Sequence, residues 1–325
     1  MKYYYGIDLG GTDTKIGLFS ETIEMIDSFI VPTPQENQNE TVFKKIKSNL
    51  IENASKNNIS LENILGIGIA VPGPVKNGIG ISFPNLDFCK NKDVKKEMEE
   101  MFGGEISIGV GNDASLAAFG EYKVIQPEHR NIVFYTLGTG VGGGLIINGE
   151  IVEGLNGIAG EFGHIQVENN FSKQCGCGGY GCLEQFSSSK AIVEYYCDLC
   201  KDKKKAFDKG SIEAKIVFDL AKKGDSMAIE TIDRMAKYIA MSAANMAVIC
   251  DPEVFVIGGG ISNAGDFLIN KIRAFYEKNA RFNGKNTSFV IAKLGNDAGM
   301  YGAAYLVKIK GESDEYKQRR IIQNH

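Results

Sequence analysis

Cysteine and histidine side chains are concentrated in one short segment of this sequence. The chain has seven cysteines and three histidines, and residues 163–185, GHIQVENNFSKQCGCGGYGCLEQ, contain three of the cysteines and one of the histidines. The cysteines are spaced C-x-C-x4-C, with His164 upstream of Cys175, Cys177 and Cys182. Three thiolates and one imidazole form a complete tetrahedral ligand set, which is typical of a structural Zn²⁺ site. A redox site, a disulfide and unliganded thiols are the alternatives, and the odd number of cysteines argues against a closed disulfide framework.

Two glycine-rich turns between apolar runs contain the residue types that bind phosphate. The first is DLGGTDTK, residues 8–15, and the second is LGTGVGGG, residues 137–144. Glycine lets backbone N–H groups approach phosphate oxygens, and a carboxylate at a strand end can hold Mg²⁺ through water. The second turn matches G-x-G-x-x-G, but a strand is predicted after it, where a dinucleotide-binding fold needs a helix. Both turns are therefore candidate phosphate sites, and an ordinary hairpin turn is the alternative for the first.

Two further loops lie between a predicted strand and a predicted helix. GGGISN, residues 258–263, could let a nucleotide base and ribose lie against the backbone, or its Ser or Asn could simply cap the helix. GNDAS, residues 111–115, contains Asn112 and Asp113, and both residue types are preferred helix caps. A carboxylate at that position can also act as a general base on a hydroxyl group. The two roles of the second loop do not exclude each other.

Two glutamates flank the histidine of the cysteine-rich segment. Glu161 precedes His164 by three residues, and Glu184 follows Cys182 by two. Ionised carboxylates only accept hydrogen bonds, which suits them to the hydroxyl groups of a sugar. Surface charge is the alternative for each glutamate taken singly.

The composition excludes several classes of protein. At roughly 150 residues per domain, a chain of 325 residues predicts about two domains. Its 36 basic and 40 acidic residues give a net charge of −4, without the excess of positive charge typical of nucleic-acid binding. The first residues, MKYYYGIDLGG, lack the apolar core of a signal peptide, and no apolar run approaches the ~18 residues that span a membrane. We expect a cytoplasmic protein with reduced cysteines and neither a membrane nor a nucleic-acid partner.

Predicted strands and helices alternate along the chain, which indicates an α/β fold. Residues 3–7 and 15–19 form a predicted hairpin around the first glycine-rich turn, and residues 131–136 and 145–147 form a second one. This weak two-copy repeat suggests a duplicated α/β domain. Further strands are predicted at 64–71, 106–110, 254–257 and 289–292, and helices at 40–58, 114–122, 188–208, 212–223, 227–251 and 299–308, with a charged tail that frays from Lys310.

The motifs, taken in order, resemble the ROK family of sugar kinases (repressor, open reading frame, kinase). The resemblance covers essentially the whole chain and includes IDLGGTDTK, VPGP, FPNLDF, GNDASLAAFGE, LGTGVGGGLI, GEFGH, CGCGGYGCLEQ and VIGGGISNAG. It implies two ribonuclease-H-like domains of the actin/sugar-kinase/Hsp70 superfamily, with an active-site cleft between them. The first domain would comprise residues 1–113 plus about 299–325, and the second about 114–298, including the zinc motif.

The resemblance also assigns roles to individual residues. For phosphate it implies Asp8, Gly10, Gly11, Thr12 and Lys15 in the first turn, and Gly138, Thr139 and Gly140 in the second. For adenosine it implies Gly258, Gly259 and Gly260. For the sugar it implies Gly73, Asn85, Asn112, Asp113, Glu161, His164 and Glu184, with Asp113 as catalytic base. For zinc it implies His164, Cys175, Cys177 and Cys182.

The activity implied is ATP-dependent phosphorylation of a hexose at its 6-hydroxyl, with glucose as the first candidate and with Mg²⁺ and a structural Zn²⁺ as cofactors. Ser115 and Phe88 stand where the family often has Asn and Trp, so N-acetylmannosamine, fructose and allose stay alternatives to glucose. Polyphosphate is an alternative donor, and the family implies a homodimer. A sugar-sensing ROK regulator is the other class, but such proteins carry an N-terminal helix-turn-helix domain, and here the first phosphate motif begins at Asp8.

Overall fold

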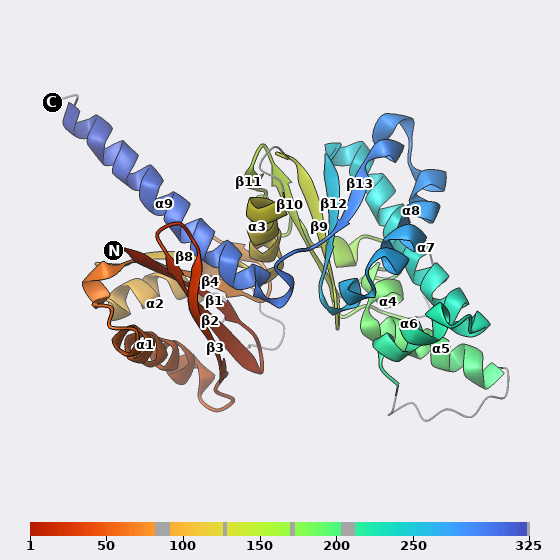
Figure 1. Ribbon diagram of the computed structural model, residues 1–325, viewed down its shortest axis with the longest axis horizontal. Coiled ribbons are helices and arrows are strands. Elements are labelled where there is room, and N and C mark those ends of the chain that lie inside the picture. The colour runs from red at the N-terminus through yellow and green to blue at the C-terminus, as the bar shows by residue number, and fades with distance from the viewer. Residues whose placement is uncertain (82–91, 126–128, 170–172, 203–211, 324–325) are drawn as a thin grey trace. The chain divides into compact units, whose positions relative to one another are not determined.

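The computed structural model of the chain, which describes residues 1–81, 92–125, 129–169, 173–202 and 212–323, divides into two compact units (Figure 1). The first unit comprises Met1–Lys123, Glu153–Ile158 and Asp297–His325, and the second comprises Val124–Val152 and Ala159–Asn296. Each unit has its own five-stranded sheet and its own helices. The predicted α/β class is therefore confirmed.

The sheet of the first unit has the strand order β3-β2-β1-β4-β8. Its strands are β1 (Tyr3–Leu9), β2 (Asp13–Ser20), β3 (Met25–Pro32), β4 (Ile64–Val71) and β8 (Ser107–Asn112). The first three form an antiparallel meander, and β4 and β8 then pair parallel to β1. Because β4 and β8 run parallel to β1, the carboxyl ends of all three strands meet at one edge of the sheet. Asp8, at the end of β1, and Asn112, at the end of β8, both belong to that edge.

Helices cover both faces of this first sheet. Helices α1 (Gln38–Lys56) and α2 (Val94–Met101) pack their apolar side chains against alternate strand residues in one core, and α9 (Ala298–Gln323) packs on the other face. On that second face the strands carry glycine, because a Cβ atom at Gly6 or Gly68 would run into the backbone of α9. Helix α9 continues to Gln323, so the expected fraying from residue 310 is wrong for most of the tail, whose Glu, Lys, Gln and Arg residues favour helix.

Helix α3 (Asp113–Ile125) belongs almost entirely to the first unit, whose first segment ends at Lys123. Its small residues allow a close approach to α9: Gly120 lies against the carbonyl of Ala298, and Gly302 lies against that of Leu116. The sequence placed the domain boundary at the start of this helix, whereas the compact units divide near its end.

The sheet of the second unit repeats the order of the first, as β11-β10-β9-β12-β13. Its strands are β9 (Ile132–Leu137), β10 (Val141–Ile147), β11 (Glu150–Ile151), β12 (Val254–Gly258) and β13 (Ser288–Ile291). Here too an antiparallel meander is extended by two parallel strands. The duplicated α/β domain predicted from the two hairpins is therefore confirmed.

In the described part of the second unit, the helices that pack with the second sheet are α4 (Glu184–Ser187), α5 (Ser189–Asp202), α6 (Ala214–Lys222), α7 (Ser226–Cys250) and α8 (Asp266–Asn279). Their apolar side chains share one core with β9 and β12. Helix α7 begins with a proper cap, since the Asp225 carboxylate accepts from the N–H groups of Met227 and Ala228.

Short elements complete the chain. A three-stranded sheet consists of β5 (Val75–Lys76), β6 (Ile79–Gly80) and β7 (Lys92–Asp93), and the 3-10 helices are η1 (Leu61–Asn63), η3 (Phe162–His164), η5 (Gly260–Ala264), η6 (Phe282–Asn286) and η7 (Gly295–Asp297). Within the described ranges, no helix is both long enough and apolar enough to cross a membrane.

Candidate functional site

The four residues predicted to bind zinc come together. One ligand atom from each of His164, Cys175, Cys177 and Cys182 lies within 4.8 Å of the others. Tetrahedral Zn²⁺ with Zn–S bonds of ~2.3 Å requires sulfur atoms about 3.8 Å apart, and the sulfur atoms of Cys177 and Cys182 are 3.7 Å apart. The Nδ1 atom of His164 lies 3.7 Å from the Cys175 sulfur, so it is this ring nitrogen that faces the thiols. The donor set therefore has the size and chemistry of a tetrahedral metal site.

Glycines shape the loop that brings these sulfur atoms together. Gly178 and Gly181 have φ angles of +87° and +68°, which favour glycine. A Cβ atom at Gly181 would run into the carbonyl of Glu168, and one at Gly179 would lie 3.4 Å from the Cys177 sulfur. The glycine content of the segment thus follows from the tight loop that the ligand set needs.

Asn112 holds the start of α3 and the residues beside it. Its Oδ1 accepts from the N–H of Ser115 (2.9 Å), which is the geometry of a helix cap. Its Nδ2 donates to the carbonyl of Gly73 (3.0 Å) and to Oδ1 of Asp113 (3.1 Å). Oδ1 of Asp113 also accepts from the N–H of Ala114, at 2.7 Å. Asn112 is therefore the cap, and it fixes the orientation of the Asp113 carboxylate that the sequence proposed as base.

The first glycine-rich turn closes the β1–β2 hairpin at residues 10–12. The N–H of Gly10 donates to the carbonyl of Asp13 (3.0 Å), and a Cβ atom at Gly10 would lie 2.7 Å from that oxygen. Side chains from the segment after β3 hold the turn from outside: Thr33 donates to the carbonyl of Gly10 and Gln35 to that of Gly11. The turn is thus a tightly held piece of backbone, and the side chain of Thr12 at its tip is exposed.

Asp8 lies beside this turn in a half-buried position. It is paired across the hairpin with Lys15, and the Cα of Gly299 lies so close that a Cβ there would be 3.0 Å from the Asp8 carboxylate. Burial raises the pKa of the Asp8 carboxyl, Lys15 opposes the shift, and Asp297 adds to it. A carboxylate whose charge is disfavoured by burial gains most from a bound cation, which fits the predicted role in holding Mg²⁺.

The second glycine-rich turn, at the end of the β9–β10 hairpin, is tied to the cysteine-rich segment. Oε2 of Glu184 accepts from the N–H of Val141 (3.0 Å), and it occupies the space that a side chain at Gly140 would need. The carbonyl of Gly138 accepts from the N–H of Ser189 (2.8 Å), at the start of α5. The hairpin is therefore fixed by the helices that follow the metal ligands.

Three of the residues predicted to bind sugar influence one another. The pKa of the Glu161 carboxyl is raised, chiefly by burial, while His164 lowers it and Glu184 raises it further. Asn85, another predicted sugar ligand, lies outside the described residues. The electrostatic coupling of Glu161, His164 and Glu184 shows that the structure brings these polar groups together around the metal ligands.

A cavity of about 1070 Å³ in the second unit connects two of the predicted nucleotide motifs. Gly138 and Thr139 of the hairpin line it together with Gly260 of η5, although more than a hundred residues separate them in sequence. The loop before η5 is closely packed: Gly259 has a φ angle of +79°, and its Cα lies against the backbone of Leu137. A Cβ atom at Gly258 would lie 2.8 Å from the Phe134 ring. The two motifs therefore face one space that is large enough for a nucleotide.

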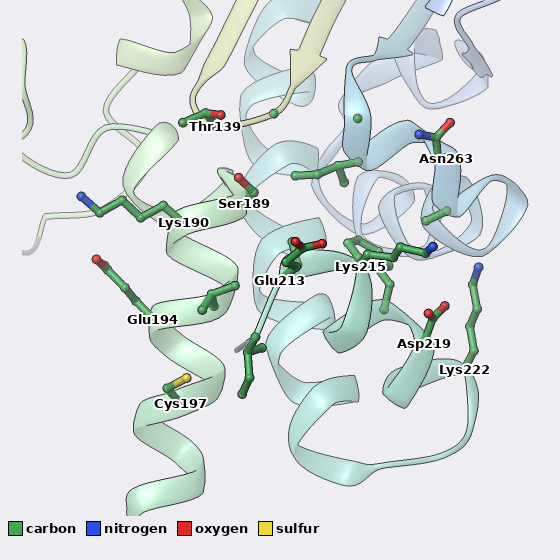
Figure 2. A pocket seen from close by; sticks show the side chains of 18 residues that line it. Thr139, Ser189, Lys190, Glu194, Cys197, Glu213, Lys215, Asp219, Lys222 and Asn263 are labelled. Carbon is green, nitrogen blue, oxygen red and sulfur yellow. The ribbon is translucent and has the colours of Figure 1, made fainter. Parts of the chain in front are cut away.

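Most residues that line this cavity were missed by sequence reasoning. They include polar and charged residues of α5, of α6 and of the two positions before α6 as well as apolar ones, namely Ser189, Lys190, Val193, Glu194, Cys197, Ile212, Glu213, Lys215, Phe218, Asp219 and Lys222. Figure 2 shows Lys190, Glu194 and Cys197 spaced along α5, with Thr139 at one end of the cavity. No motif marks these positions, because only the packing of two helices makes them neighbours.

Two sheets of the same strand order, each opened by a glycine-rich hairpin, define the α/β fold of the actin/sugar-kinase/Hsp70 superfamily. The chain belongs to the ROK family, whose model matches residues 4–310.

Named relatives and a solved structure agree with this assignment. The chain is 35% identical to a glucokinase of Halalkalibacterium halodurans, over 97% of each chain. It is 28% identical to an N-acetyl-D-glucosamine kinase of Haemophilus influenzae, over 94% of this chain and all of that one. A ROK glucokinase from Streptomyces griseus, solved with glucose and AMPPNP, superposes with a TM-score of 0.77 at 29% identity, covering 94% of this chain and 99% of that one.

Proposed function

We propose that the protein is an ATP-dependent glucokinase, which transfers the γ-phosphoryl group of ATP to the 6-hydroxyl of glucose. The observation that carries this proposal is the cavity shared by the β9–β10 hairpin and the η5 loop, because it joins a phosphate motif to an adenosine motif. The 35% identity to a named glucokinase over nearly the full length supports glucose as the acceptor.

In the proposed mechanism Asp113 is the general base. Its carboxylate accepts the proton of the sugar 6-hydroxyl while that oxygen attacks the γ-phosphorus, the bond to the bridging oxygen breaks, and ADP leaves. Asn112 contributes by fixing Oδ1 of Asp113 at 3.1 Å from its own Nδ2. The backbone of the two glycine-rich turns orients the phosphates, because phosphoryl transfer depends chiefly on positioning and electrostatics.

Asp8 would hold Mg²⁺, whose positive charge neutralises the phosphate oxygens during transfer. His164, Cys175, Cys177 and Cys182 would hold a structural Zn²⁺. Four protein ligands leave a tetrahedral ion no open position for water, so zinc would support the site without taking part in the chemistry. Since Nδ1 of His164 faces the thiols, Nε2 stays available to a sugar hydroxyl.

The second candidate activity is phosphorylation of an amino sugar. It is favoured by one observation, the 28% identity to an N-acetyl-D-glucosamine kinase over the full length of that protein. N-acetylmannosamine, fructose and allose also remain candidates from the family, as does polyphosphate in place of ATP. A sugar-sensing regulator has no need of a catalytic base, so Asp113 and the two phosphate turns favour a kinase.

We expect the protein to act as a cytoplasmic homodimer. All six cysteines in the described part of the chain are free, as the reducing cytoplasm requires. Val248 and Ile249 at the end of α7 and Phe282 on η6 are large apolar side chains with 62%, 72% and 88% exposure, and these two elements contact each other. Sedimentation analysis of the purified protein will show whether it is a dimer.

A coupled assay of ADP release tests the proposed function. The acceptors are glucose, mannose, fructose, allose, N-acetylglucosamine and N-acetylmannosamine, each with ATP and with polyphosphate, the latter followed by sugar phosphate formation. We expect the highest kcat/KM for glucose with ATP. A higher kcat/KM for an amino sugar than for glucose would favour the second candidate activity. Absence of turnover with every pair of acceptor and donor would contradict the assignment as a kinase.

Asp8→Asn is expected to separate stability from activity. Burial raises the pKa of the Asp8 carboxyl, so ionisation of this group costs folding free energy, and the neutral amide removes that cost. The stability of the wild-type protein should decline as the pH rises through the raised pKa, while that of the variant should not. We expect a higher melting temperature at pH 7 without Mg²⁺, together with a loss of Mg²⁺-dependent turnover.

The matched control for this prediction is Asp13→Asn, an exposed carboxylate of the same hairpin. It should leave both stability and turnover close to wild type. A variant Asp8→Asn that melts below wild type at pH 7 would show that the carboxylate contributes to the fold in its charged form.

A further inference from the structure

A second, smaller cavity of about 250 Å³ lies on the other side of α5 from the proposed nucleotide cavity. Its walls are formed by Phe186, Tyr195 and Arg234, with Lys173 and Gln185 beside them. Glu194 lines both cavities. None of the motifs that define the family site contributes Arg234, and the proposed mechanism does not use it.

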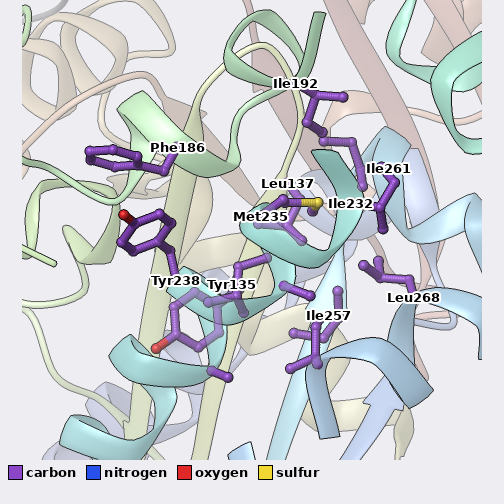
Figure 3. Packing of buried hydrophobic residues seen from close by; sticks show 14 of the residues in the cluster. Tyr135, Leu137, Phe186, Ile192, Ile232, Met235, Tyr238, Ile257, Ile261 and Leu268 are labelled. Atoms are coloured by element: carbon purple, nitrogen blue, oxygen red, sulfur yellow. The ribbon is translucent and has the colours of Figure 1, made fainter. Parts of the chain in front are cut away.

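Arg234 is held between aromatic rings. Its guanidinium carbon lies 4.2 Å from the ring centroid of Tyr195, 4.7 Å from that of Phe186 and 5.6 Å from that of Tyr238. Two of these rings pack against each other at the edge of the core, with centroids 4.4 Å apart, as seen for Phe186 and Tyr238 in Figure 3. Stacking on rings uses the faces of the guanidinium plane and leaves its five N–H donors at the edges.

These donors have no acceptor among the described residues. In the part of the chain that the structure describes, Arg234 makes cation–π contacts but no hydrogen bond and no ion pair. The side chain is half-buried, and burial lowers the pKa of its guanidinium. None of its guanidinium nitrogens is both fully buried and without a partner, so these donors are accessible to an acceptor from outside the chain.

The neighbouring carboxylates are already engaged with other groups. Glu194 pairs with Lys173 at 2.7 Å, and Asp198 pairs with Lys201 at 3.2 Å. Glu168 accepts from the hydroxyl of Tyr238 (2.7 Å), and Glu230 accepts from that of Tyr195 (3.3 Å). Among the described residues Arg234 therefore has no direct ion-pair or hydrogen-bond partner, although the nearby Glu168 carboxylate raises the pKa of its guanidinium.

We propose that Arg234, together with Lys173, binds the phosphate group of a small metabolite in this cavity. The planar guanidinium edge offers paired N–H donors that match two phosphate oxygens, and the compact ammonium of Lys173 can take a third. A phosphate dianion offers a third oxygen to the ammonium after the guanidinium has taken two, and its two negative charges match the two cations. The cavity is small, so the phosphate group fits inside it and any attached sugar extends outward.

A phosphate bound at this site would change the affinity of the nucleotide cavity for ATP. A phosphate that draws Lys173 to itself removes the 2.7 Å partner of Glu194, whose carboxylate also lines the larger cavity. The freed negative charge would weaken the binding of ATP phosphates. The site is therefore an inhibitory one: phosphate or sugar phosphate bound there lowers the affinity of the nucleotide cavity for ATP.

Calorimetric titration of the zinc-loaded protein tests this proposal. The protein is first saturated with glucose and a non-hydrolysable ATP analogue, so that the proposed active site is filled, and is then titrated with inorganic phosphate or with glucose 6-phosphate. We expect one further site for at least one of these probes. Loss of a charge-assisted bidentate contact in Arg234→Gln should weaken it by about 10-fold or more. Tighter binding of glucose 6-phosphate than of inorganic phosphate identifies a sugar phosphate as the ligand, and the reverse order identifies free phosphate.

Two other variants complete the test. Lys173→Gln removes the second cation from an exposed position, so it should weaken the further site even if Arg234→Gln loses stability with its aromatic stack. Arg273→Gln changes the same charge on an exposed part of α8 outside the cavity and should bind like wild type. Absence of a further site in the wild-type protein, or equal affinity in all four proteins, would overturn the proposal. Failure of the ATP analogue to bind at all would instead contradict the proposed kinase function.

Discussion

Asp113→Asn should reduce kcat by roughly 10²–10⁴-fold, the range expected when a general base is lost. The change replaces one oxygen by NH₂ and keeps the size of the side chain. Asparagine can still accept from the N–H of Ala114 and from Nδ2 of Asn112, which contact Oδ1 in the wild-type protein at 2.7 Å and 3.1 Å. The fold and the start of α3 should therefore survive, and only the proton acceptor should be lost. Steady-state kinetics with glucose and ATP, with thermal melting on the same samples, measure both expectations.

Asp93→Asn is the matched control for this variant. Asp93 also stands at a helix start, where its carboxylate accepts from the N–H of Lys96 at 2.9 Å, but it caps α2 and has no role in the proposed reaction. It should keep wild-type turnover. If Asp113→Asn folds normally and turns over at a rate near wild type, another group removes the proton of the sugar hydroxyl.

Much of the fold follows from the apolar pattern of the sequence, but one edge strand does not. The buried strands β1, β4, β9 and β12 are nearly continuous apolar runs, and each lies where the sequence predicted a strand. Strand β3 (Met25–Pro32) was not predicted: Asp27 and Ser28 interrupt its apolar residues, and none of its positions is fully buried. The strand forms only because β2 offers it a partner, which is a tertiary cause that local sequence does not carry.

Helix α2 (Val94–Met101) was also missed. Only Val94 and Met98 of its residues are buried, and all its other positions except Met101 are charged. The sequence predicts that the final helix ends at residue 308, whereas α9 continues to Gln323, because the charged residue types of the tail favour helix. Charge density is therefore a poor guide to helix ends in this chain.

Some features of the candidate site were predicted from local motifs, and others arise only from tertiary packing. The zinc ligands lie in one loop of 19 residues from His164 to Cys182, so spacing alone predicted that they converge. The link between Glu184 and the N–H of Val141, by contrast, joins two motifs more than forty residues apart. Neither the nucleotide-cavity residues of α5 and α6 nor the aromatic setting of Arg234 has a sequence signal, because ordinary helix positions acquire these roles only by packing.

Cys177→Ser should lose zinc and sugar affinity together. A serine hydroxyl is a much poorer zinc ligand than a thiolate, and one lost ligand opens the closed tetrahedral set. We expect the zinc affinity to fall by more than the roughly 10–100-fold that loss of an outer-shell partner costs. Cys177 is exposed, so the substitution itself removes little packing. Zinc content by mass spectrometry and the KM for glucose are measured on the same preparation.

The reason to expect a change in KM lies in the position of His164. Its Nδ1 faces the thiols at 3.7 Å, so the metal would fix the ring and with it the direction of Nε2. Glu184 stands two residues after Cys182 and holds the β9–β10 hairpin through Val141, so loosening of the metal loop reaches a second proposed sugar ligand. The KM for glucose should therefore rise about 10-fold or more, while the variant still binds ATP.

Cys250→Ser is the control for the chemistry of the substitution. Cys250 lies at the end of α7, outside the metal cluster, and its thiol donates to the carbonyl of Met246, which a serine hydroxyl can also do. This variant should keep its zinc and its KM. If Cys177→Ser loses zinc while the KM for glucose stays at the wild-type value, the metal stabilises the loop without orienting His164 toward the sugar. In that case the sugar affinity would depend on Glu161 and Glu184 independently of the metal. His164 would then act on the pKa of the Glu161 carboxyl without contributing to sugar binding.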